Sequence, residues 1–550
     1  MAKAWENRRE QMFPRFSAAQ IERLRSLGEC RHVTAGTIVF EQGDATPNFN
    51  VVISGSLEIV QPVDGREEPI TVHSPGEFTG ETNMLSGRRT LVRCRAREDS
   101  DLLVMTPEAL RKVVQTDSEL SEILLRAFIL RRVALIAEGR GDAVLIGSSH
   151  SAATLRIREF LTHNGQPHLY LDVEKDPGVQ ALLDRFQVEI HEIPVVICRY
   201  ERVLKNPTNE EVADCLGLNP AMEPAQVHDL VVVGAGPAGL AAAVYGASEG
   251  LDVLVLESHA PGGQAGSSSK IENYLGFPTG ISGQALAGRA ITQAQKFGAE
   301  IAIARSAAML RCQQRPYEVE LAGGSTVKAR TVIIATGAQY RKIELPELSR
   351  FEGNGVYYGA TPVEAQLCEA EEVIVVGGGN SAGQAAVFLS NGARHVHVMV
   401  RGKGLTDTMS RYLIHRIEVG KNITLRPFTQ ITALEGDGRL ERVRFVDSRK
   451  HETMTLPVRH VFLMTGALPN TEWLQRCVAL DEKGFVKTGP DVTQEELTSW
   501  PLKRPPYLLE TNRPGVFAVG DVRSNSVKRV ASAVGEGSIS IQLIHRVLAE

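Results

Sequence analysis

The segment Val231-Val-Val-Gly-Ala-Gly-Pro-Ala-Gly239 decides the fold of the C-terminal part of this chain. Its apolar start predicts a buried parallel strand, and the alanine-rich residues after it predict a helix. Glycines in such a turn let the backbone approach a pyrophosphate at the N-terminus of the helix. The segment therefore predicts a dinucleotide site formed by Gly234, Gly236, Pro237, Ala238 and Gly239.

A second copy of this pattern, Ile374-Val-Val-Gly-Gly-Gly-Asn-Ser-Ala382, occurs later in the chain. It has the same kind of apolar run before its glycines and an alanine-rich run after them. A single glycine fingerprint is weak evidence, whereas two in the same setting favour two dinucleotides bound by one chain. The candidate residues of the second site are Gly377, Gly379, Asn380, Ser381 and Ala382.

The two copies differ at the position 23 residues after their first glycine, which is Glu257 in one and Val400 in the other. A carboxylate there accepts hydrogen bonds from an adenosine ribose diol. Val400 cannot do this, and the neighbouring Arg401 and Lys403 instead offer positive charge to a 2′-phosphate. We therefore expect FAD at the first site and NADPH, in preference to NADH, at the second.

Length and composition narrow the classes of protein that remain. A chain of 550 residues can hold three or four domains. A formal net charge of −5 provides no basic field, and we expect no nucleic-acid partner. The polar N-terminus and the lack of an apolar stretch of about 18–20 residues predict neither a signal peptide nor a membrane span. Seven scattered cysteines without a C-x-x-C pair predict reduced thiols and a cytoplasmic protein.

Residues 13–106 show short β-type runs separated by glycine, and residues 107–137 show apolar positions at helical spacing. This order predicts a small β-barrel or jelly roll followed by helices, and it resembles the cyclic-nucleotide-binding domain family. The resemblance implies that Gly80 and Glu81 bind the ribose hydroxyl of a cyclic nucleotide. It also implies that Arg89, beside Thr90, neutralises the cyclic phosphate.

Two interpretations of this barrel stay open. Leu91 stands where the family has a small residue, and many barrels of this kind bind no nucleotide and serve as docking modules. The barrel is therefore either a cyclic-nucleotide site or purely structural. No helix-turn-helix pattern follows it, which argues against a transcription factor.

Residues 142–219 show a compact strand and helix pattern that resembles the glutaredoxin and thioredoxin family, with Ile193-Pro194 in the place of that family's cis-proline. The loop Gly147-Ser-Ser-His-Ser-Ala152 has serines where the family has cysteines. A serine hydroxyl cannot supply the thiolate that disulfide exchange requires. We expect a redox-inert module in which Cys198 and Cys215 are ordinary small buried residues.

From Asp229 to the C-terminus the chain resembles the low-molecular-weight thioredoxin reductase family almost continuously. The resemblance implies one FAD-binding domain in two sequence pieces around one inserted NAD(P)-binding domain, and we expect a homodimer. Beyond the fingerprints it is carried by the segments 261–264, 272–278, 332–337, 511–521 and 528–531. The implied FAD contacts in these segments are Gly263, Gln264, Asn273, Thr336, Gly337, Gly520, Asp521, Arg529, Val530 and Ala531.

The family's redox-active Cys-Ala-Thr-Cys is replaced here by Gly359-Ala-Thr-Pro362. Without two thiols no internal disulfide can form there, which closes the family's relay from flavin to thioredoxin. Cys368 stands alone nearby, and we expect it to be inert. No side chain is therefore assigned a catalytic role, because the chemistry is expected to centre on the flavin, and no metal site is predicted.

These patterns predict a multidomain chain: an N-terminal β-barrel with helices, a central α/β thioredoxin-like domain, and a C-terminal α/β reductase with two dinucleotide sites. The predicted boundaries are 1–140 for the cyclic-nucleotide-binding-like domain, 141–221 for the thioredoxin-like domain, 222–228 for a linker, 229–340 and 467–550 for the two FAD pieces, and 341–466 for the NAD(P) domain.

The main functional hypothesis is an FAD-dependent NAD(P)H oxidoreductase. It would pass electrons from NADPH through FAD to an external acceptor that the sequence does not identify, and a cyclic nucleotide on the barrel would gate it. One alternative is a redox or cyclic-nucleotide sensor or scaffold that binds FAD and turns over little. A further alternative is a thioredoxin-disulfide reductase with displaced thiols.

Overall fold

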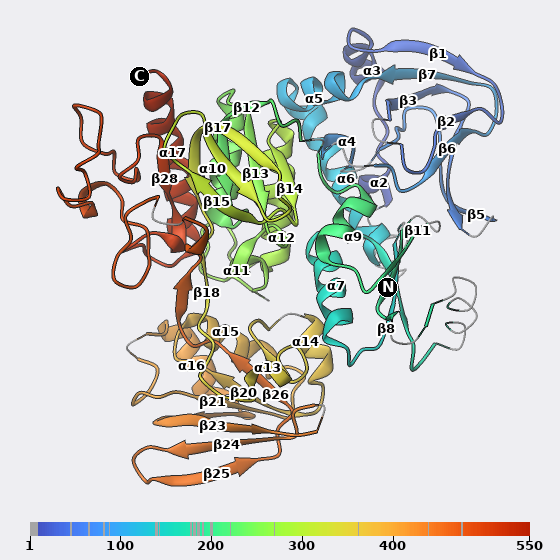
Figure 1. The fold of residues 1–550 in the computed structure, drawn as a ribbon. Helices are drawn as coiled ribbons and strands as arrows, with labels where there is room; N and C mark the ends of the chain where they lie inside the picture. The colour runs from blue at the N-terminus through green and yellow to red at the C-terminus, as the bar shows by residue number, and fades with distance from the viewer. Residues whose placement is uncertain are drawn as a thin grey trace.

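The chain folds into three parts, a strand-rich N-terminal domain, a middle module and a C-terminal region of two α/β domains (Figure 1). We name the last two the first and second fingerprint domains, after the glycine turn that each contains. Within the described residues, no helix is both long and apolar enough to cross a membrane. The computed structural model describes residues 9–44, 47–63, 66–80, 83–86, 89–137, 141, 143–176, 179, 183, 188–189, 192–198, 202–220, 222–268, 270–360, 362–406, 408–437, 439–474 and 477–550.

The N-terminal domain consists of two antiparallel sheets, one in the order β1-β7-β3 and one in the order β2-β6-β4-β5. Phe49, Phe78 and Phe128 form a fully buried aromatic core between the strands and the last helix, α6. The elements are β1 (Glu29–Val33), β2 (Ile38–Phe40), β3 (Phe49–Ser54), β4 (Leu57–Val63), β5 (Arg66–His73), β6 (Arg93–Ala96), β7 (Ser100–Met105), α2 (Arg9–Met12), α3 (Ala18–Arg25), α4 (Asn83–Ser86), α5 (Pro107–Thr116) and α6 (Ser118–Ala137).

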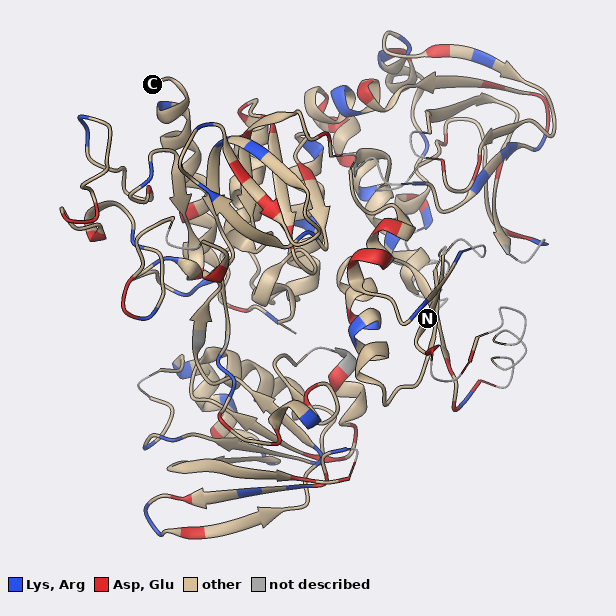
Figure 2. Cartoon of the chain, viewed as in Figure 1, with Lys and Arg blue, Asp and Glu red and all other residues tan. Residues whose placement is uncertain are grey.

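Acidic partners neutralise Arg93 and Arg95 of β6. Arg93 pairs with Glu41 at 2.8 Å, and Arg95 pairs with Glu58 at 2.8 Å. Glu67 contacts both arginines. Figure 2 shows basic and acidic residues interspersed in this way through all parts of the chain, in keeping with its small net charge.

The described residues of the middle module form a mixed sheet in the order β11-β10-β8-β9, together with the helices α7 and α9. The peptide bond between Ile193 and Pro194 is cis, at the position where the sequence pattern places it. Capping residues fix both ends of α9. Thr208 caps its N-terminus, and Gly217 adopts a left-handed conformation at its C-terminal end. The elements are β8 (Ala143–Gly147), β9 (His168–Asp172), β10 (Val195–Cys198), β11 (Arg202–Lys205), α7 (Ala152–His163) and α9 (Asn209–Leu216).

Polar contacts fasten the middle module to the first fingerprint domain. Arg305 forms ion pairs with Glu210 and Asp214 of α9. The Ile303 amide donates to the Asn219 side chain at 2.6 Å. Apolar residues of both parts also belong to one continuous buried core. The module is therefore packed onto its neighbour.

The first fingerprint domain is a sheet in the order β14-β13-β12-β17-β16-β15, with β28 added beside β17. Its central strands are parallel and are buried on both faces, which explains their continuous Val, Leu and Ile runs. The elements are β12 (Val227–Val233), β13 (Val253–Glu257), β14 (Glu300–Ile303), β15 (Ala307–Arg311), β16 (Tyr317–Leu321), β17 (Thr326–Ile334), β28 (Val516–Ala518), α10 (Pro237–Ser248), α11 (Gly263–Gly266), α12 (Gly283–Lys296) and α17 (Val530–Leu548).

The second fingerprint domain has a parallel sheet in the order β19-β26-β20-β21-β22 and a three-stranded antiparallel sheet, β23-β24-β25. The chain enters through β18 (Ala338–Tyr340) and leaves through β27 (Ala467–Pro469), which pair with each other. The other elements are β19 (Val356–Tyr357), β20 (Glu372–Val376), β21 (His395–Met399), β22 (Ile423–Arg426), β23 (Thr429–Glu435), β24 (Arg442–Asp447), β25 (Glu452–Leu456), β26 (His460–Leu463), α13 (Leu348–Phe351), α14 (Pro362–Leu367), α15 (Asn380–Leu389) and α16 (Arg411–Val419).

Two disulfides correct the expectation of reduced thiols throughout. Cys198 bonds to Cys215, with 6.3 Å between their Cα atoms, and Cys312 bonds to Cys477, with 6.0 Å. Cys198 and Cys215 are buried, as expected, but they are paired because Cys198 ends β10 and Cys215 lies on α9, which packs against that strand. The sequence spacing gave no sign of either pair. The free cysteines are Cys30, Cys94 and Cys368.

Candidate dinucleotide sites

The first glycine turn has the geometry that the sequence predicts. Gly234, directly after β12, has a φ of +108°, and a Cβ there would overlap the Ala335 carbonyl oxygen. Gly236 is the N-cap of α10 and is open, since a Cβ there would have the Gly263 Cα as its nearest neighbour at 4.0 Å. The first glycine is therefore needed by the fold, and the second leaves a bare helix N-terminus.

The predicted acid lies over this turn. Glu257 ends β13, which is parallel to β12, and its side chain is buried. One carboxylate oxygen accepts from the Ala235 amide at 2.8 Å, and the other accepts from the His259 amide at 2.9 Å. Parallel strands end at the same edge of the sheet, which brings this carboxylate to the glycine turn.

Other predicted residues of the first site converge on the same edge. A Cβ on Gly263 would lie 3.1 Å from the Gly236 Cα, and the Gln264 side-chain amide donates to the Ala338 carbonyl. The Thr336 hydroxyl donates to the Asn470 carbonyl at 2.8 Å, where the two crossings between the domains meet. Gly337 follows with a φ of +63°. Asn273, in contrast, is exposed in the loop between α11 and α12.

The second sequence piece closes the site from the other side. Gly520 follows β28, and a Cβ there would lie 3.0 Å from the Ala238 Cβ on α10. Burial raises the pKa of Asp521, and the Lys528 ammonium opposes that shift. Arg529 is the N-cap of α17, in which Val530 and Ala531 are the first residues.

A cavity of about 290 Å³ lies between α10, α11, α12 and the start of α17, and its walls are mostly apolar. The fingerprint residue Pro237 and the predicted contact Val530 both line it. An open glycine, a carboxylate held at the glycine turn and an adjoining apolar cavity together fit a flavin dinucleotide. The remaining lining residues include Leu240, Ala241, Gly262, Tyr274, Phe277 and Ala287.

The second glycine turn repeats the geometry of the first. Gly377 has a φ of +143°, and a Cβ there would overlap the Met464 carbonyl oxygen. Gly379, the N-cap of α15, has no atom within 4 Å of the place of its Cβ. Asn380 and Ser381 open α15, and Ala382 is buried beneath them.

The loop after β21 is tied to this second turn. The Thr408 hydroxyl donates to the Gly378 carbonyl at 2.7 Å, and the Asn380 side chain accepts from the Ser410 amide at 2.7 Å. Val400 is buried, while Arg401 and Lys403 are exposed on the tethered loop. Neither Thr408 nor Ser410 can be recognised from the sequence, because each acts through a contact 30 residues away along the chain.

Two further polar contacts join segments that lie far apart in the sequence. Glu536 of α17 accepts from the Gly520 amide at 2.7 Å and pairs with Arg523 at 2.6 Å, so it orders the Gly520–Asp521 turn. Glu272 forms an ion pair with Arg416 of α16, which links the two fingerprint domains directly. Glu272 lies in the segment 272–278 that carries the family resemblance, but nothing local in the sequence indicates its pairing with Arg416, and no local pattern marks Glu536 as different from a solvated surface residue.

Gly359, the first of the two predicted dithiol positions, lies against the first fingerprint domain. A Cβ on Gly359 would be 3.9 Å from the Ser267 Cβ, and Ser267 caps α11. Pro362 begins α14. Cys368 is buried just after α14, and burial, together with Glu364 and Glu371, raises the pKa of its thiol. A thiol held in the protonated form is a poor nucleophile.

Two of the predicted cyclic-nucleotide residues, Arg89 and Thr90, form hydrogen bonds within the N-terminal domain. The Arg89 guanidinium donates to the Gly43 carbonyl at 3.0 Å, and the Thr90 hydroxyl donates to the Glu41 carbonyl at 2.6 Å. Gly80 has a φ of +107°. Glu81 lies outside the described residues. A cavity of about 340 Å³ lies elsewhere, between β1, β2, β3 and β7, and Gly80, Arg89 and Thr90 do not line it.

Buried His73 makes the stability of this domain depend on pH. Burial lowers its pKa to about 4, against 6.5 in an unfolded chain, and Glu77 only partly opposes this. Because the unfolded state binds the proton first, stability is complete above about pH 6.5 and falls as the pH drops toward 4. Between pH 7 and 5 this amounts to about 2 kcal/mol. In calorimetry, His73→Gln is expected to reduce that loss, whereas His415→Gln, at an exposed position on α16, should leave it unchanged.

Comparisons with known proteins cover both ends of the chain. The family model described as pyridine nucleotide-disulphide oxidoreductase matches residues 228–537, and that described as cyclic nucleotide-binding domain matches residues 30–117. The thioredoxin reductase of Bacillus subtilis (strain 168) is 32% identical over 329 residues, which are 60% of this chain and 97% of that protein. NADPH-dependent thioredoxin reductase 3 of Arabidopsis thaliana is 30% identical over 367 residues. The aligned region covers 63% of this chain and 65% of that protein.

Solved structures agree with these relatives. The crystal structure of the T. acidophilum thioredoxin reductase is similar over 59% of this chain and 99% of that one, at 29% identity and a TM-score of 0.52. The Lactococcus lactis thioredoxin reductase, in a crystal structure titled as the FR conformation, is similar over 58% and 99%, at 27% identity and the same score. The matches confirm the predicted reductase region and cyclic-nucleotide-binding domain, while the thioredoxin-like interpretation of the middle module stays a prediction.

Proposed function

Because the chain belongs to the pyridine nucleotide-disulphide oxidoreductase family and is a thioredoxin reductase-like FAD and NAD(P) oxidoreductase with a cyclic nucleotide-binding domain, we propose that it oxidises NADPH and passes the electrons to an acceptor outside the chain. Bound FAD would supply the chemistry, since it accepts a hydride and releases electrons to a second substrate. We place the FAD domain at residues 229–340 and 467–550 and the NAD(P) domain at 341–466. Residues 1–140, 141–221 and 222–228 are then the barrel, the thioredoxin-like module and the linker.

Named residues would hold the two dinucleotides. Gly236 at the start of α10 would meet the FAD pyrophosphate, and Glu257 would accept hydrogen bonds from the ribose. Gly379 at the start of α15 would meet the NADPH pyrophosphate. Arg401 and Lys403 would neutralise its 2′-phosphate.

The observation that supports an acceptor outside the chain is the pair Gly359 and Pro362, which stands where the family has two cysteines.

The disulfide Cys312–Cys477 cannot replace the family's dithiol, because it lies far from the glycine turn. Strand register places Arg311, Glu318, Lys328 and Val227 in one row across the sheet, and Cys312 directly follows Arg311. The Gly234 turn comes seven residues after Val227, roughly 20 Å along the strands at about 3.3 Å per residue. The disulfide Cys312–Cys477 therefore lies near the start of β12, whereas the glycine turn follows the end of that strand.

The proposal is tested by mixing holoprotein with NADPH in a stopped-flow spectrometer. Full bleaching of the FAD absorbance is expected, together with thioredoxin reduction in a coupled insulin assay no faster than background. An oxidised FAD spectrum that persists under excess NADPH would contradict the proposal that the protein oxidises NADPH. Robust thioredoxin turnover contradicts the external acceptor, and Cys368→Ser would then show whether that thiol carries the electrons. A screen of quinones, ferredoxin, oxygen and small disulfides identifies the acceptor class.

Cofactor preference depends on the tethered basic loop. Arg401→Ala with Lys403→Ala is expected to raise the KM for NADPH by about tenfold or more and to leave the KM for NADH unchanged, because charge-assisted contacts to a phosphate contribute roughly 1.5–3 kcal/mol. Lys421→Ala, which removes an exposed lysine beyond the end of α16, is the matched control. Equal effects on both nucleotides would show that the loop does not contact the 2′-phosphate.

A second candidate function is a sensor or scaffold in which the barrel binds a cyclic nucleotide and turnover is negligible. The cyclic-nucleotide-binding domain match favours it. Calorimetry with cyclic AMP and cyclic GMP on wild type and Arg89→Ala separates a ligand site from a docking module, since the docking module gives no heat. A ligand that binds one domain arrangement more tightly would also gate the reductase.

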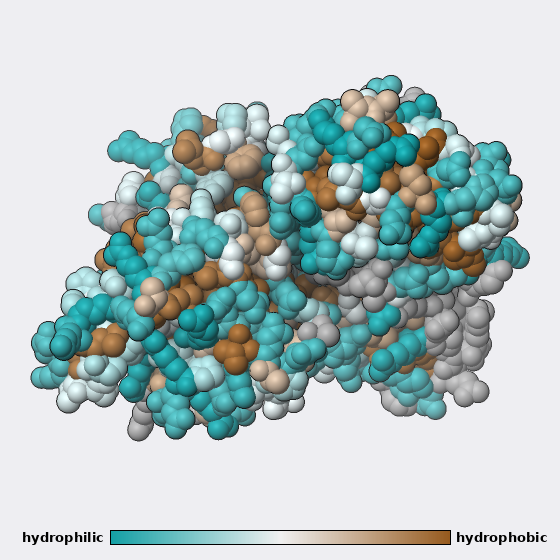
Figure 3. All heavy atoms as spheres, turned by 90° about the horizontal axis from the view of Figure 1, so that it is seen from above, coloured by the Kyte–Doolittle hydropathy of each residue, from teal (hydrophilic) through white to brown (hydrophobic). Residues whose placement is uncertain are grey.

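We also propose a homodimer through the first fingerprint domain. Its exposed apolar side chains include Tyr245 on α10 and Ile539 on α17. Leu275 and Val527, which lie in loops, are exposed as well. Figure 3 shows apolar atoms gathered in patches between hydrophilic ones on the face seen from above. Light scattering of wild type and Ile539→Lys tests this state, with a monomeric variant as the expected result.

A further inference from the structure

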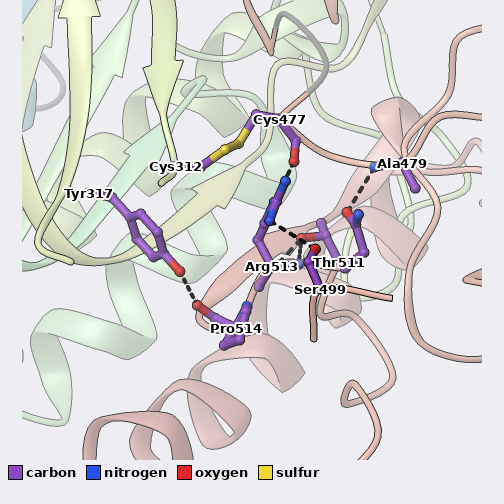
Figure 4. The surroundings of a disulfide bond; sticks show 9 residues. Cys312, Tyr317, Cys477, Ala479, Ser499, Thr511, Arg513 and Pro514 are labelled. Carbon is purple, nitrogen blue, oxygen red and sulfur yellow. Dashed lines mark hydrogen bonds between the residues drawn. A yellow bond between two sulfur atoms is a disulfide. The ribbon is translucent and has the colours of Figure 1, made fainter. Parts of the chain in front are cut away.

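The disulfide Cys312–Cys477 joins the two sequence pieces of the first fingerprint domain. Cys312 directly follows β15. Cys477 comes soon after the short helix η2 (Glu472–Leu474), on the segment that returns from the second fingerprint domain. The sequence separation is 165 residues, so the covalent loop encloses the whole of that domain. Both sulfurs lie in a buried core, and Figure 4 shows the bond between them.

The segment that carries Cys477 supports the turn Thr511–Gly515. The Arg513 guanidinium donates to the Cys477 carbonyl at 2.8 Å. The Asn512 side chain accepts from the Ala479 amide at 2.9 Å (Figure 4). Movement of this segment would therefore remove one side of the support beneath the turn.

The hairpin that carries Cys312 supports the same turn from the opposite side. The Tyr317 hydroxyl donates to the Pro514 carbonyl (Figure 4). The Arg315 guanidinium donates to the same carbonyl at 2.6 Å. The disulfide thus covalently connects the two supports between which the turn is held.

The turn sets the position of β28, and β28 leads to the predicted FAD contacts. Val516 and Ala518 pair with Val332 and Ile334 of β17, and β28 has only three residues. A strand this short has few ladder hydrogen bonds of its own, so the turn that feeds it matters. Gly520 and Asp521 follow β28 after one residue, Val519.

From this arrangement we propose that Cys312 and Cys477 form a reversible thiol–disulfide site whose oxidation fastens the second sequence piece and so slows the release of FAD. The oxidant is a small disulfide of the glutathione class. The two cysteine thiols lose two protons and two electrons and form one S–S bond, while the S–S bond of the oxidant breaks and its sulfurs leave as two thiols. Because both cysteines are buried, exchange requires local opening of the segment. The proposal rests on FAD binding, as set out above.

The test equilibrates full-length holoprotein with mixtures of reduced and oxidised glutathione. Alkylation in denaturant followed by mass spectrometry gives the oxidised fraction of Cys312 and Cys477, and FAD fluorescence after dilution gives the release rate. Release is expected to be at least about fivefold faster from protein with the reduced pair, because the support opens more often. The rate should follow the oxidised fraction of this pair.

Two serine variants separate the disulfides. Cys312→Ser with Cys477→Ser should release FAD fast in every buffer. Cys198→Ser with Cys215→Ser removes the disulfide of the middle module and should keep the full redox dependence. If the first variant fails to fold, the wild-type titration alone still decides, because it needs no substitution.

The remaining outcomes each decide the question. Equal release rates from the oxidised and reduced pair overturn the proposal, and so does a pair that stays in one state from full oxidation to full reduction. A wild-type protein that binds no FAD contradicts the proposed function instead. In that case the thermal unfolding midpoint of the variant Cys198→Ser with Cys215→Ser, measured with and without reductant, tests the remaining pair, and equal midpoints overturn the proposal.

Discussion

Gly236→Ala is expected to leave the first fingerprint domain folded and to weaken FAD binding by at least about tenfold, which is roughly 1.4 kcal/mol. The backbone at Gly236 has a φ of −70°, which any residue adopts, and the nearest atom to an added methyl group is 4.0 Å away. That methyl group would nevertheless occupy the space through which a pyrophosphate reaches the N-terminus of α10. Fluorescence titration of apoprotein with FAD measures the affinity, and circular dichroism measures the fold.

Two other glycines of the first fingerprint domain serve as controls for this result. Gly234→Ala should lose both the fold and FAD, because a φ of +108° and the Ala335 carbonyl leave no room for a side chain. Gly288→Ala, on the open face of α12, should change neither quantity. Wild-type FAD affinity in Gly236→Ala would show that the pyrophosphate does not lie at this turn.

Gly379→Ala is expected to keep FAD bound and to slow its reduction by NADPH at least about tenfold at a fixed nucleotide concentration. The backbone φ of −92° tolerates alanine, and no protein atom lies within 4 Å of the added Cβ. The methyl group would meet only an incoming pyrophosphate. Stopped-flow absorbance measures the reduction rate, and dithionite should still reduce the variant fully because its FAD site is untouched.

The control for the second turn is Gly392→Ala, which adds a methyl group to an open loop of the same domain and should reduce normally. Gly377→Ala should instead unfold the domain, because its Cβ would overlap the Met464 carbonyl. If Gly379→Ala is reduced as fast as wild type, NADPH does not bind at this turn. If dithionite also reduces the variant slowly, the substitution has disturbed the FAD site and not only NADPH binding.

The local features of the sites were predictable from the sequence. Each fingerprint needs a strand end, a left-handed glycine and a helix start within nine consecutive residues, and no distant contact changes that requirement. Glu257 could be placed by counting, because two adjacent parallel strands end at the same edge of a sheet. The family comparison confirms the reductase region to which these features belong.

The contacts between distant segments were not predictable. Counting placed Arg401 and Lys403 on a loop, but the bonds of Thr408 and Ser410 that hold this loop over the glycine turn follow from the packing of α16 beside α15. Arg89 illustrates the same limit, since its guanidinium donates to the Gly43 backbone, an ordinary structural contact that its motif could not reveal.

The amino-acid sequence alone determined that this chain carries two glycine turns of the dinucleotide-binding kind, and it predicts that Gly359 and Pro362 stand where a dithiol relay would need two thiols. Both are matters of residue identity over short range: backbone sterics decide the first, and the chemistry of sulfur decides the second. Only the tertiary structure decided which cysteines pair. Cys312 and Cys477 meet because β15 and the returning segment pack into one core, and no spacing along the chain encodes that meeting.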